Sequence, residues 1–210
     1  MIGAAEIVNG AEGNDSPNGT TFADFLSGGL GNDIMLGGTG NDIYVVDATG
    51  DRVFETSTTS SVVDAGGIDT VQSAVSFNLD ATAGVRFVER LTLTGTANVN
   101  ATGNALANIL TGNAGNNVLN GGLGNDVMLG GVGNDTFNFN TTLGVTNIDR
   151  ISDFTFSTIR SVWMMRFSSD SRWARSRRVR SPQISRGLRR MHRTGLSEVA
   201  RSVATAFRFR

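Results

Sequence analysis

The chain has 210 residues, with 27 glycines, two prolines and no cysteine or lysine. The absence of cysteine excludes disulfides, thiolate metal sites and a thiol nucleophile. The net charge of −1 conceals two unlike segments, because residues 1–159 carry 17 acidic groups and four arginines, whereas residues 160–210 carry 14 arginines and two acidic groups. No apolar run is long enough to cross a bilayer, and residues 1–10 lack the basic start and apolar stretch of an ordinary signal peptide.

The acidic segment contains a nonapeptide repeat. Four tandem copies fill residues 10–45 and four more fill residues 103–138. The last two copies of each block are strict: GGLGNDIML (28–36), GGTGNDIYV (37–45), GGLGNDVML (121–129) and GGVGNDTFN (130–138). The first two of each block are degenerate: 10–18, 19–27, 103–111 and 112–120. A short, fixed period of this kind predicts a solenoid of stacked coils.

Each place in the nonapeptide has a physical meaning. Glycines at the first, second and fourth places allow tight turns and a close approach to a ligand. The sixth place offers a carboxylate in Asp15, Asp24, Asp33, Asp42, Asp126 and Asp135. The eighth place is apolar in Leu26, Met35, Tyr44, Leu110, Leu119, Met128 and Phe137, which predicts very short strands around a narrow core. Pro17 breaks the eighth-place rule, so we expect the first copy to fray into a cap.

The spacer between the blocks, residues 46–102, predicts further short strands. Hydrophobic alternation places them at 43–46, 52–55, 70–79 and 88–94, where they could continue the solenoid with longer coils. The spacer aspartates are either extra oxygen ligands or solvated turn residues, and the solvated interpretation is favoured for Asp47, Asp51, Asp64 and Asp69.

The strict copies match the Gly-Gly-x-Gly-x-Asp-x-apolar-x motif at every defined place, and in this the sequence resembles the hemolysin-type, repeats-in-toxin (RTX) family. The resemblance implies an all-β fold, a right-handed parallel β-roll whose turns bind Ca²⁺ through aspartate carboxylates and backbone carbonyls. Hard oxygen ligands suit Ca²⁺, whereas Zn²⁺ prefers histidine or thiolate. The implied metal-site residues are the six sixth-place aspartates and the glycines Gly28, Gly31, Gly37, Gly40, Gly121, Gly124, Gly130 and Gly133.

In such a roll each ion lies between a turn and the next but one. This pairs Asp15 with Asp33 and Asp24 with Asp42 in the first block, and Asn108 with Asp126 and Asn117 with Asp135 in the second. We expect the site formed by turns 10–15 and 28–33 to be the best formed, and the neutral amides to weaken the second-block sites. Gly-Asn-Asp turns also occur in hairpins without a metal, but the tandem spacing of nine favours calcium.

The arginine-rich tail, residues 159–210, departs from the family, whose C-termini carry a type I export signal. Three interpretations compete: an electrostatic nucleic-acid or surface binder, a disordered tail, or a frameshifted product. Single-codon residues favour the frameshift, because Val162-Trp163-Met164-Met165 read from the last base of the valine codon encodes an apolar residue followed by Asp-Asp. Such a frameshift would damage the export signal.

The sequence therefore predicts one β-roll over residues 1–158 and a poorly structured tail over 159–210. Its predicted function is calcium binding by a secreted, non-catalytic module without an N-terminal signal peptide. The only histidine is His192, and no catalytic triad or phosphate-binding loop appears. Alternatives are an adhesin or matrix spacer with a cell-envelope or polysaccharide partner, or a fragment of a larger RTX toxin or hydrolase. The type I secretion machinery is an expected partner if the C-terminus is intact, and nucleic acid is not an expected one.

Overall fold

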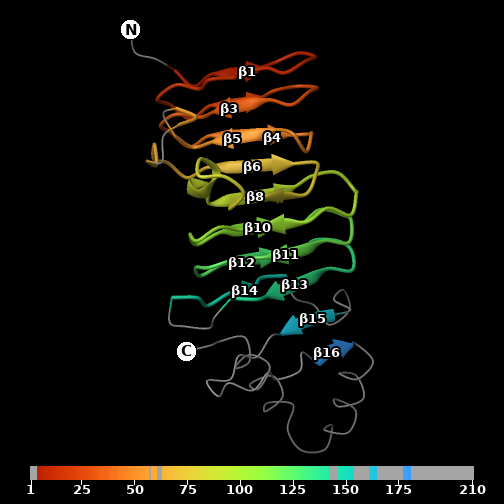
Figure 1. Ribbon diagram of the computed structural model, residues 1–210. Coiled ribbons are helices and arrows are strands. Elements are labelled where there is room, and N and C mark those ends of the chain that lie inside the picture. Colours follow the sequence, from red (N-terminus) through yellow and green to blue (C-terminus); the bar gives the residue numbers. More distant parts are fainter. Residues whose placement is uncertain are drawn as a thin grey trace, which may run out of the picture.

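The structure is a computed structural model that describes residues 4–56, 58–60, 63–141 and 146–153, together with the backbone of 161–164 and 177–180. Its regular elements are short strands, two to four residues long, and one 3-10 helix, η1 (Val85–Phe87). The strands stack into a column of coils in chain order (Figure 1). No helix in the described part of the chain is long and apolar enough to span a membrane.

One face of the column is a single eight-stranded sheet that runs through both repeat blocks and the spacer. Its strands, in spatial order, are β1 (Ile7–Asn9), β2 (Phe25–Ser27), β4 (Ile43–Val46), β6 (Thr70–Ser73), β8 (Arg90–Leu93), β10 (Ile109–Thr111), β12 (Val127–Leu129) and β14 (Arg150–Ile151). Every neighbouring pair is parallel. The two blocks therefore belong to one continuous solenoid.

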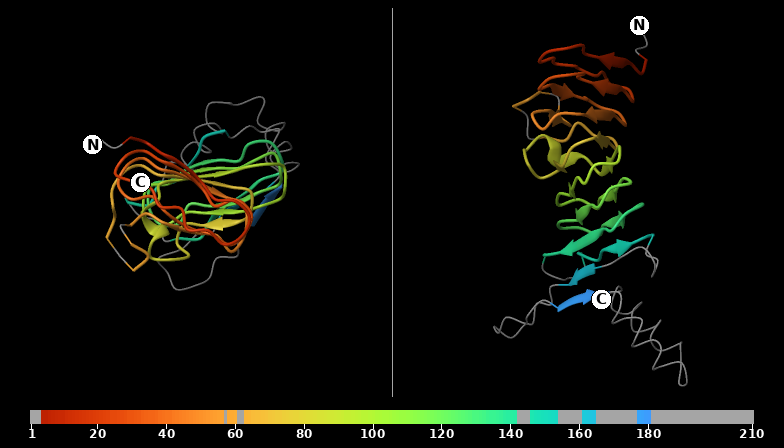
Figure 2. Two further views of the ribbon diagram at one scale, coloured as in Figure 1. Left: turned by 90° about the horizontal axis from the view of Figure 1, so that it is seen from above. Right: turned by 90° about the vertical axis from the view of Figure 1, so that its right-hand side faces the viewer.

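The opposite face consists of the intervening strands. β3 (Ile34–Leu36) pairs with β5 (Arg52–Phe54), and a separate sheet contains β7 (Phe77–Asn78), β9 (Ala101–Thr102), β11 (Val118–Asn120), β13 (Thr136–Phe139), β15 (Ser161–Met164) and β16 (Arg177–Arg180). Only β16, of the described strands, pairs antiparallel. Within the repeats the register advances by 18 residues, as in Ile34 opposite Arg52, so two nonapeptides make one coil. Seen from above, the coils overlie one another as a flattened loop (Figure 2). The predicted parallel β-solenoid is confirmed.

The core is a stripe of eighth-place side chains, as the repeat predicts. Those in the repeat blocks are fully buried: Leu26, Met35, Tyr44, Leu110, Leu119, Met128 and Phe137. Their neighbours along each strand face outward, because successive side chains of a strand point to opposite sides. The spacer continues the stripe with Val53, Val71 and Leu91.

One prediction about local structure is wrong, and a second holds only in part. The expected strand over 70–79 is two strands, β6 and β7, that belong to different sheets, with a corner between them where the Ser73 hydroxyl donates to the Val75 carbonyl. The first copy forms no strand, only isolated bridges at Glu12 and Asn18, yet it stays in register, because Pro17 is buried and its carbonyl accepts the Leu36 N–H at 3.0 Å. A proline without an N–H is tolerated there because its carbonyl alone joins the ladder. The frameshift hypothesis concerns residues that lie almost wholly outside the described ones.

Replacing a core residue tests the stacked stripe. Leu110→Ala is expected to lower the free energy of unfolding in calcium by about 2–5 kcal/mol, because the narrow core cannot collapse around the cavity. Leu123→Ala is the matched control, since Leu123 is 54% exposed and its truncation is expected to change stability by about 0.5 kcal/mol or less. Urea unfolding followed by circular dichroism measures both, and equal effects of the two variants would contradict the assignment of the core.

Candidate metal centres in the turns

Sixth-place side chains are stacked along both edges of the solenoid. In the first block the backbone N–H of Asp15 donates to Oδ1 of Asp33 at 2.8 Å, and that of Asp24 donates to Oδ1 of Asp42 at 2.7 Å. In the second block the N–H groups of Asn108 and Asn117 donate to Oδ1 of Asp126 and Asp135 at 2.8 and 3.0 Å. The structure thus brings together all four pairs that the sequence predicts.

We call this series, in which the backbone N–H of one sixth-place residue donates to the sixth-place carboxylate of the next coil, the carboxylate ladder. The ladder extends beyond the repeats. The N–H of Asp33 donates to Asp51 at 3.1 Å, and the N–H of Asp42 donates to Asp69 at 2.7 Å. Asp51 and Asp69 are buried, so the solvated interpretation is wrong for them, whereas Asp47 and Asp64 are exposed as it predicts.

Two ladder members were missed by the sequence reasoning. Glu89 accepts the N–H of Asp69 at 2.8 Å, and Asp149 accepts the N–H of Asp126 at 3.2 Å. Their sequence separations of 20 and 23 residues depart from multiples of nine, so the repeat period gives no signal for either residue.

The second residue of each turn decides whether the turn closes on its own sixth-place side chain. In the degenerate copies this residue is Ala11, Thr20, Asn104 or Asn113, and its N–H donates to the sixth-place side chain of the same turn at 2.6–2.9 Å. In the strict copies it is a glycine with φ between 81° and 93°. Among the described bonds, none runs from these glycines to the aspartate of their own turn.

Positive φ is the physical reason for this difference. No described residue other than glycine has positive φ, so the degenerate turns keep the ordinary backbone and close on themselves. A Cβ on Gly29 would also lie 2.2 Å from the carbonyl oxygen of Ala11 in the coil before. The second glycine therefore leaves the aspartate of its turn open while letting the backbones stack closely.

The remaining glycines of the motif provide space. A Cβ on Gly28 would lie 1.9 Å from Oδ2 of Asp33, so the first glycine makes room for the carboxylate of its own turn. The fourth glycine stacks on the coil before, since a Cβ on Gly31 would lie 1.7 Å from the Gly13 carbonyl oxygen. The other predicted site glycines follow the same pattern. An added Cβ would meet the aspartate of its own turn at the first-place glycines Gly37, Gly121 and Gly130, and a backbone carbonyl at the fourth-place glycines Gly40, Gly124 and Gly133.

In the degenerate turns of the second block, asparagine side-chain amides donate to backbone carbonyls of the coil before; we call these the amide-sealed turns. The side-chain amide of Asn117 donates to the carbonyl of Val99 at 2.7 Å, and that of Asn108 donates to the carbonyl of Val88 at 3.2 Å. A carboxylate has no N–H to donate, so it would leave these carbonyls facing another acceptor. The amide group thus supplies the positive pole that a cation would supply in a strict copy.

Three of the four strict turns keep a buried oxygen without a partner. Among the described side chains, Oδ2 of Asp33, Asp42 and Asp126 is buried and accepts no hydrogen bond. The four arginines whose side chains are described, Arg52, Arg86, Arg90 and Arg150, are exposed, so none of them neutralises these groups. A buried carboxylate without a partner is costly, and either a proton or a bound cation removes that cost.

Burial perturbs the ladder carboxylates in the direction this predicts. Loss of solvent raises the pKa of Asp126 to about 7, with a further contribution from the nearby charge of Asp149. It likewise raises the pKa of Asp69 to about 7, and the pKa values of Asp42 and Asp135 also lie above the ordinary range because of burial. Metal ligands must be deprotonated, so protons and a cation compete for these oxygens.

The donor set fits a hard divalent cation. The turns combine carboxylate oxygens without partners, backbone carbonyls and glycines that admit no side chain, and this combination suits Ca²⁺. The class defined by fold and site is a parallel β-solenoid with cation-binding turns.

Comparison with known proteins gives the class its name. The sequence model of the RTX calcium-binding nonapeptide repeat matches four copies, over residues 9–44 and 102–137. The chain therefore carries hemolysin-type calcium-binding nonapeptide repeats in both blocks, and Ca²⁺ is the ion of these repeats. A search of curated proteins and a search of solved structures each found no significant match.

Replacing an asparagine of the amide-sealed turns with aspartate tests the role of its side-chain amide. Asn117→Asp is expected to raise the Ca²⁺ concentration at which half of the chain is folded, because the carboxylate cannot donate to the Val99 carbonyl, and saturating Ca²⁺ is expected to restore the fold. A calcium titration followed by circular dichroism measures both effects. A folding midpoint equal to that of the wild type would contradict the role of the amide.

The raised pKa values predict how the calcium-free protein responds to pH. The folded state holds protons up to about pH 7 on Asp69 and Asp126, whereas an unfolded aspartate loses its proton near 3.8. Stability from these groups is therefore complete below about pH 4 and is lost as the pH rises through 7. Circular dichroism in metal-free buffer is expected to show more β structure at pH 5 than at pH 8, because protons then neutralise the buried carboxylates. The reverse order would contradict the burial of the ladder.

Proposed function

We propose that the chain is a secreted, non-catalytic module that folds into its β-roll when Ca²⁺ binds in the strict turns. The observation that carries the proposal is the set of buried, unpartnered oxygens on Asp33, Asp42 and Asp126. The metal-site residues predicted from the sequence are proposed as its ligands, with the strict turns as the principal sites. Asp15 and Asp24 contribute less, because each already accepts an N–H from its own turn.

Charge supports a folding role for the ion. Residues 1–159 carry a net charge of −13, from 17 acidic groups and four arginines, and the apolar core is a single narrow stripe. Such a chain gains little from apolar burial and suffers strong self-repulsion, so it stays unfolded until cations neutralise the ladder. Extracellular calcium modules work at about 10⁻⁴–10⁻³ M, so the chain would remain unfolded in the cytosol and fold after export.

The proposed domain organisation follows from the same logic. Residues 1–158 form the calcium-binding unit, in which the strict turns at 28–42 and 121–135 flank the spacer and the amide-sealed turns of 103–117. The proposed boundary at 159 leaves the arginine-rich tail outside this unit. Most of the tail lies outside the described residues, and its two described strands, β15 and β16, join the sheet of β13. Export through a type I machinery needs a native C-terminus, which this tail does not resemble.

A non-catalytic role is supported by what the carboxylates already do. The buried acidic groups of the repeats belong to the ladder, and their spacing follows the coil. The stacked coils also suit a spacer in an adhesin or in a larger RTX protein, in which the module would position or stabilise its neighbours.

A calcium titration tests the proposal. Far-ultraviolet circular dichroism of the full chain is expected to change from coil to β on addition of Ca²⁺ but not of Mg²⁺. Asp126→Ala is expected to move the midpoint several-fold toward higher calcium, whereas Asp80→Ala, which removes an exposed carboxylate paired with Arg86 at 2.8 Å, is expected to leave it unchanged. A spectrum that does not respond to Ca²⁺, or equal shifts in both variants, would refute the proposal.

A further inference from the structure

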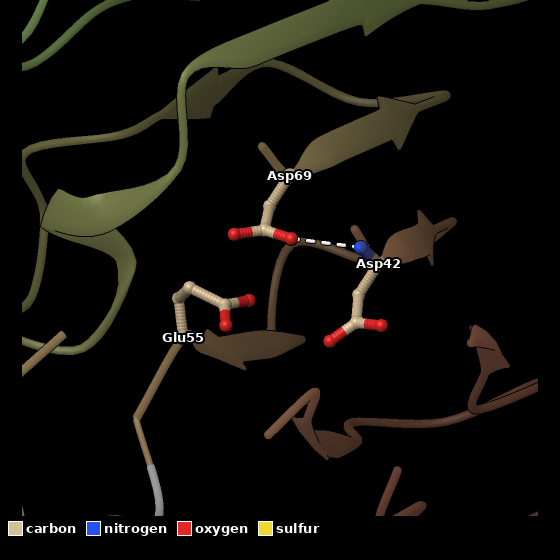
Figure 3. A group of neighbouring side chains, drawn as sticks. All are labelled: Asp42, Glu55 and Asp69. Carbon is tan, nitrogen blue, oxygen red and sulfur yellow. Dashed lines mark hydrogen bonds between the residues drawn. The ribbon is translucent and has the colours of Figure 1, made fainter. Parts of the chain in front are cut away.

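Three acidic residues meet where the first repeat block joins the spacer. Asp42 is the sixth residue of the last strict copy of that block, Asp69 is the next member of its ladder, and Glu55 follows β5 on the other face. Their exposed fractions are 0%, 1% and 0%. One carboxylate oxygen from each lies within 4.8 Å of the other two. Figure 3 shows the three carboxylates facing a common centre.

A departure from the repeat creates this cluster. Counting by nine from residue 10 puts Glu55 at a first place, where the strict copies have glycine. The ladder step from Asp42 to Asp69 is 27 residues instead of 18, so nine extra residues are accommodated outside the regular coil. Part of this insertion closes through an antiparallel bridge between Thr56 and Asp64. Glu55 thus brings a side chain into the space next to Asp42, and Asp69 replaces the missing sixth-place residue.

Each carboxylate of the cluster has one oxygen held by the protein and one without a partner. Oδ1 of Asp42 and Oδ1 of Asp69 each accept a backbone N–H at 2.7 Å, and Oε2 of Glu55 accepts the Tyr44 hydroxyl. Asp42 Oδ2, Glu55 Oε1 and Asp69 Oδ2 are buried and, among the described groups, have no hydrogen-bond partner. The unpartnered oxygens are an observation independent of the distances between the three carboxylates. They point to a positively charged occupant.

None of the described side chains supplies this positive charge. Arg52, three residues before Glu55, is exposed and its guanidinium lies over the Phe54 ring at 5.0 Å from the centroid. Oxygens on opposite sides of a Ca²⁺ ion stand about 5 Å apart, twice the usual Ca–O distance, which accords with the separations in the cluster. An all-oxygen donor set without nitrogen or sulfur favours Ca²⁺ over Zn²⁺.

We propose that Asp42, Glu55 and Asp69 bind a Ca²⁺ ion of their own, at a site the nonapeptide motif does not encode. The ion joins the first block to the spacer and fixes the nine-residue insertion. This proposal rests on the proposed function only through Asp42, which belongs to both sites. Glu55 lies outside the residues that the repeat model matches.

Tyr44 provides a built-in reporter for this site. It is the only tyrosine of the chain, and its hydroxyl donates to Glu55. Tb³⁺, which replaces Ca²⁺ at oxygen sites, emits strongly when a nearby aromatic side chain transfers excitation to it. The full chain with Trp163→Phe and Trp173→Phe, loaded with Tb³⁺, is expected to show emission on tyrosine excitation that Ca²⁺ displaces and that a further Tyr44→Phe change abolishes. Emission unaffected by Tyr44→Phe would overturn the proposal without requiring any variant of the acidic residues.

Ion counting separates this site from the repeat sites. Glu55→Gln is expected to bind one Ca²⁺ fewer per chain than the wild type in isothermal titration calorimetry, and to lose Tyr44-dependent Tb³⁺ emission. Asp80→Asn, which neutralises an exposed spacer carboxylate, is expected to bind the wild-type number. An unchanged stoichiometry in Glu55→Gln would show that the cluster holds protons instead of a metal. Asp33→Ala affects only a repeat site, so a wild-type ion count in that variant would count against the proposed function, not against the junction site.

Discussion

The central physical constraint on this fold is the burial of carboxylates to which no described arginine is paired. Eight acidic residues are buried in the described part, namely Asp24, Asp33, Asp42, Asp51, Glu55, Asp69, Asp126 and Asp135. Each hydrogen bond from the coil before, or from an adjoining turn, satisfies only one oxygen of a carboxylate. Burying a charged carboxylate costs several kcal/mol when no opposite charge compensates it. A parallel solenoid makes the problem periodic, because each coil places the same group above its predecessor. The molecule therefore needs a second source of positive charge.

The chain supplies three solutions to this constraint. In the degenerate turns of the first block the second residue closes its own N–H on the aspartate, as Thr20 does on Asp24. In the degenerate turns of the second block asparagine replaces the carboxylate, and its amide donates to a carbonyl of the coil before. In the strict turns a glycine with positive φ leaves the aspartate open, and calcium completes the turn. One substitution, at the second place of the nonapeptide, separates a turn that closes by itself from one that needs an ion.

This distribution gives the solenoid regions of unequal dependence on calcium. Each coil contacts mainly its neighbours, so stability in such architectures is close to a sum of local terms. The amide-sealed turns around Asn108 and Asn117 precede β10 and β11, and strict turns lie before and after them along the chain. In the proposed function, calcium completes the strict turns on either side, whereas the amide-sealed turns need no ion.

Much of the fold follows from the repeat alone. The period of nine and the apolar eighth place predict the coil, the core stripe and the stacking of residues 18 apart, because every copy carries the same information. The pairs Asp15–Asp33 and Asn117–Asp135 lie together as predicted. Residues outside the period could not be found in this way. Glu89 and Asp149 join the ladder across irregular steps, and Glu55 meets it beside the insertion, so their positions depend on how those loops pack. Pro17 was misjudged for a related reason, since its carbonyl is sufficient to keep the first copy in register.

The most direct test of the central claim is a crystal structure of the chain grown with Ca²⁺ and measured for anomalous scattering. The account predicts anomalous peaks beside Oδ2 of Asp33, Asp42 and Asp126, and none beside the side-chain amides of Asn108 and Asn117. Peaks distributed equally over strict and degenerate turns, or none in the strict turns, would contradict the claim that open carboxylate oxygens create the calcium sites.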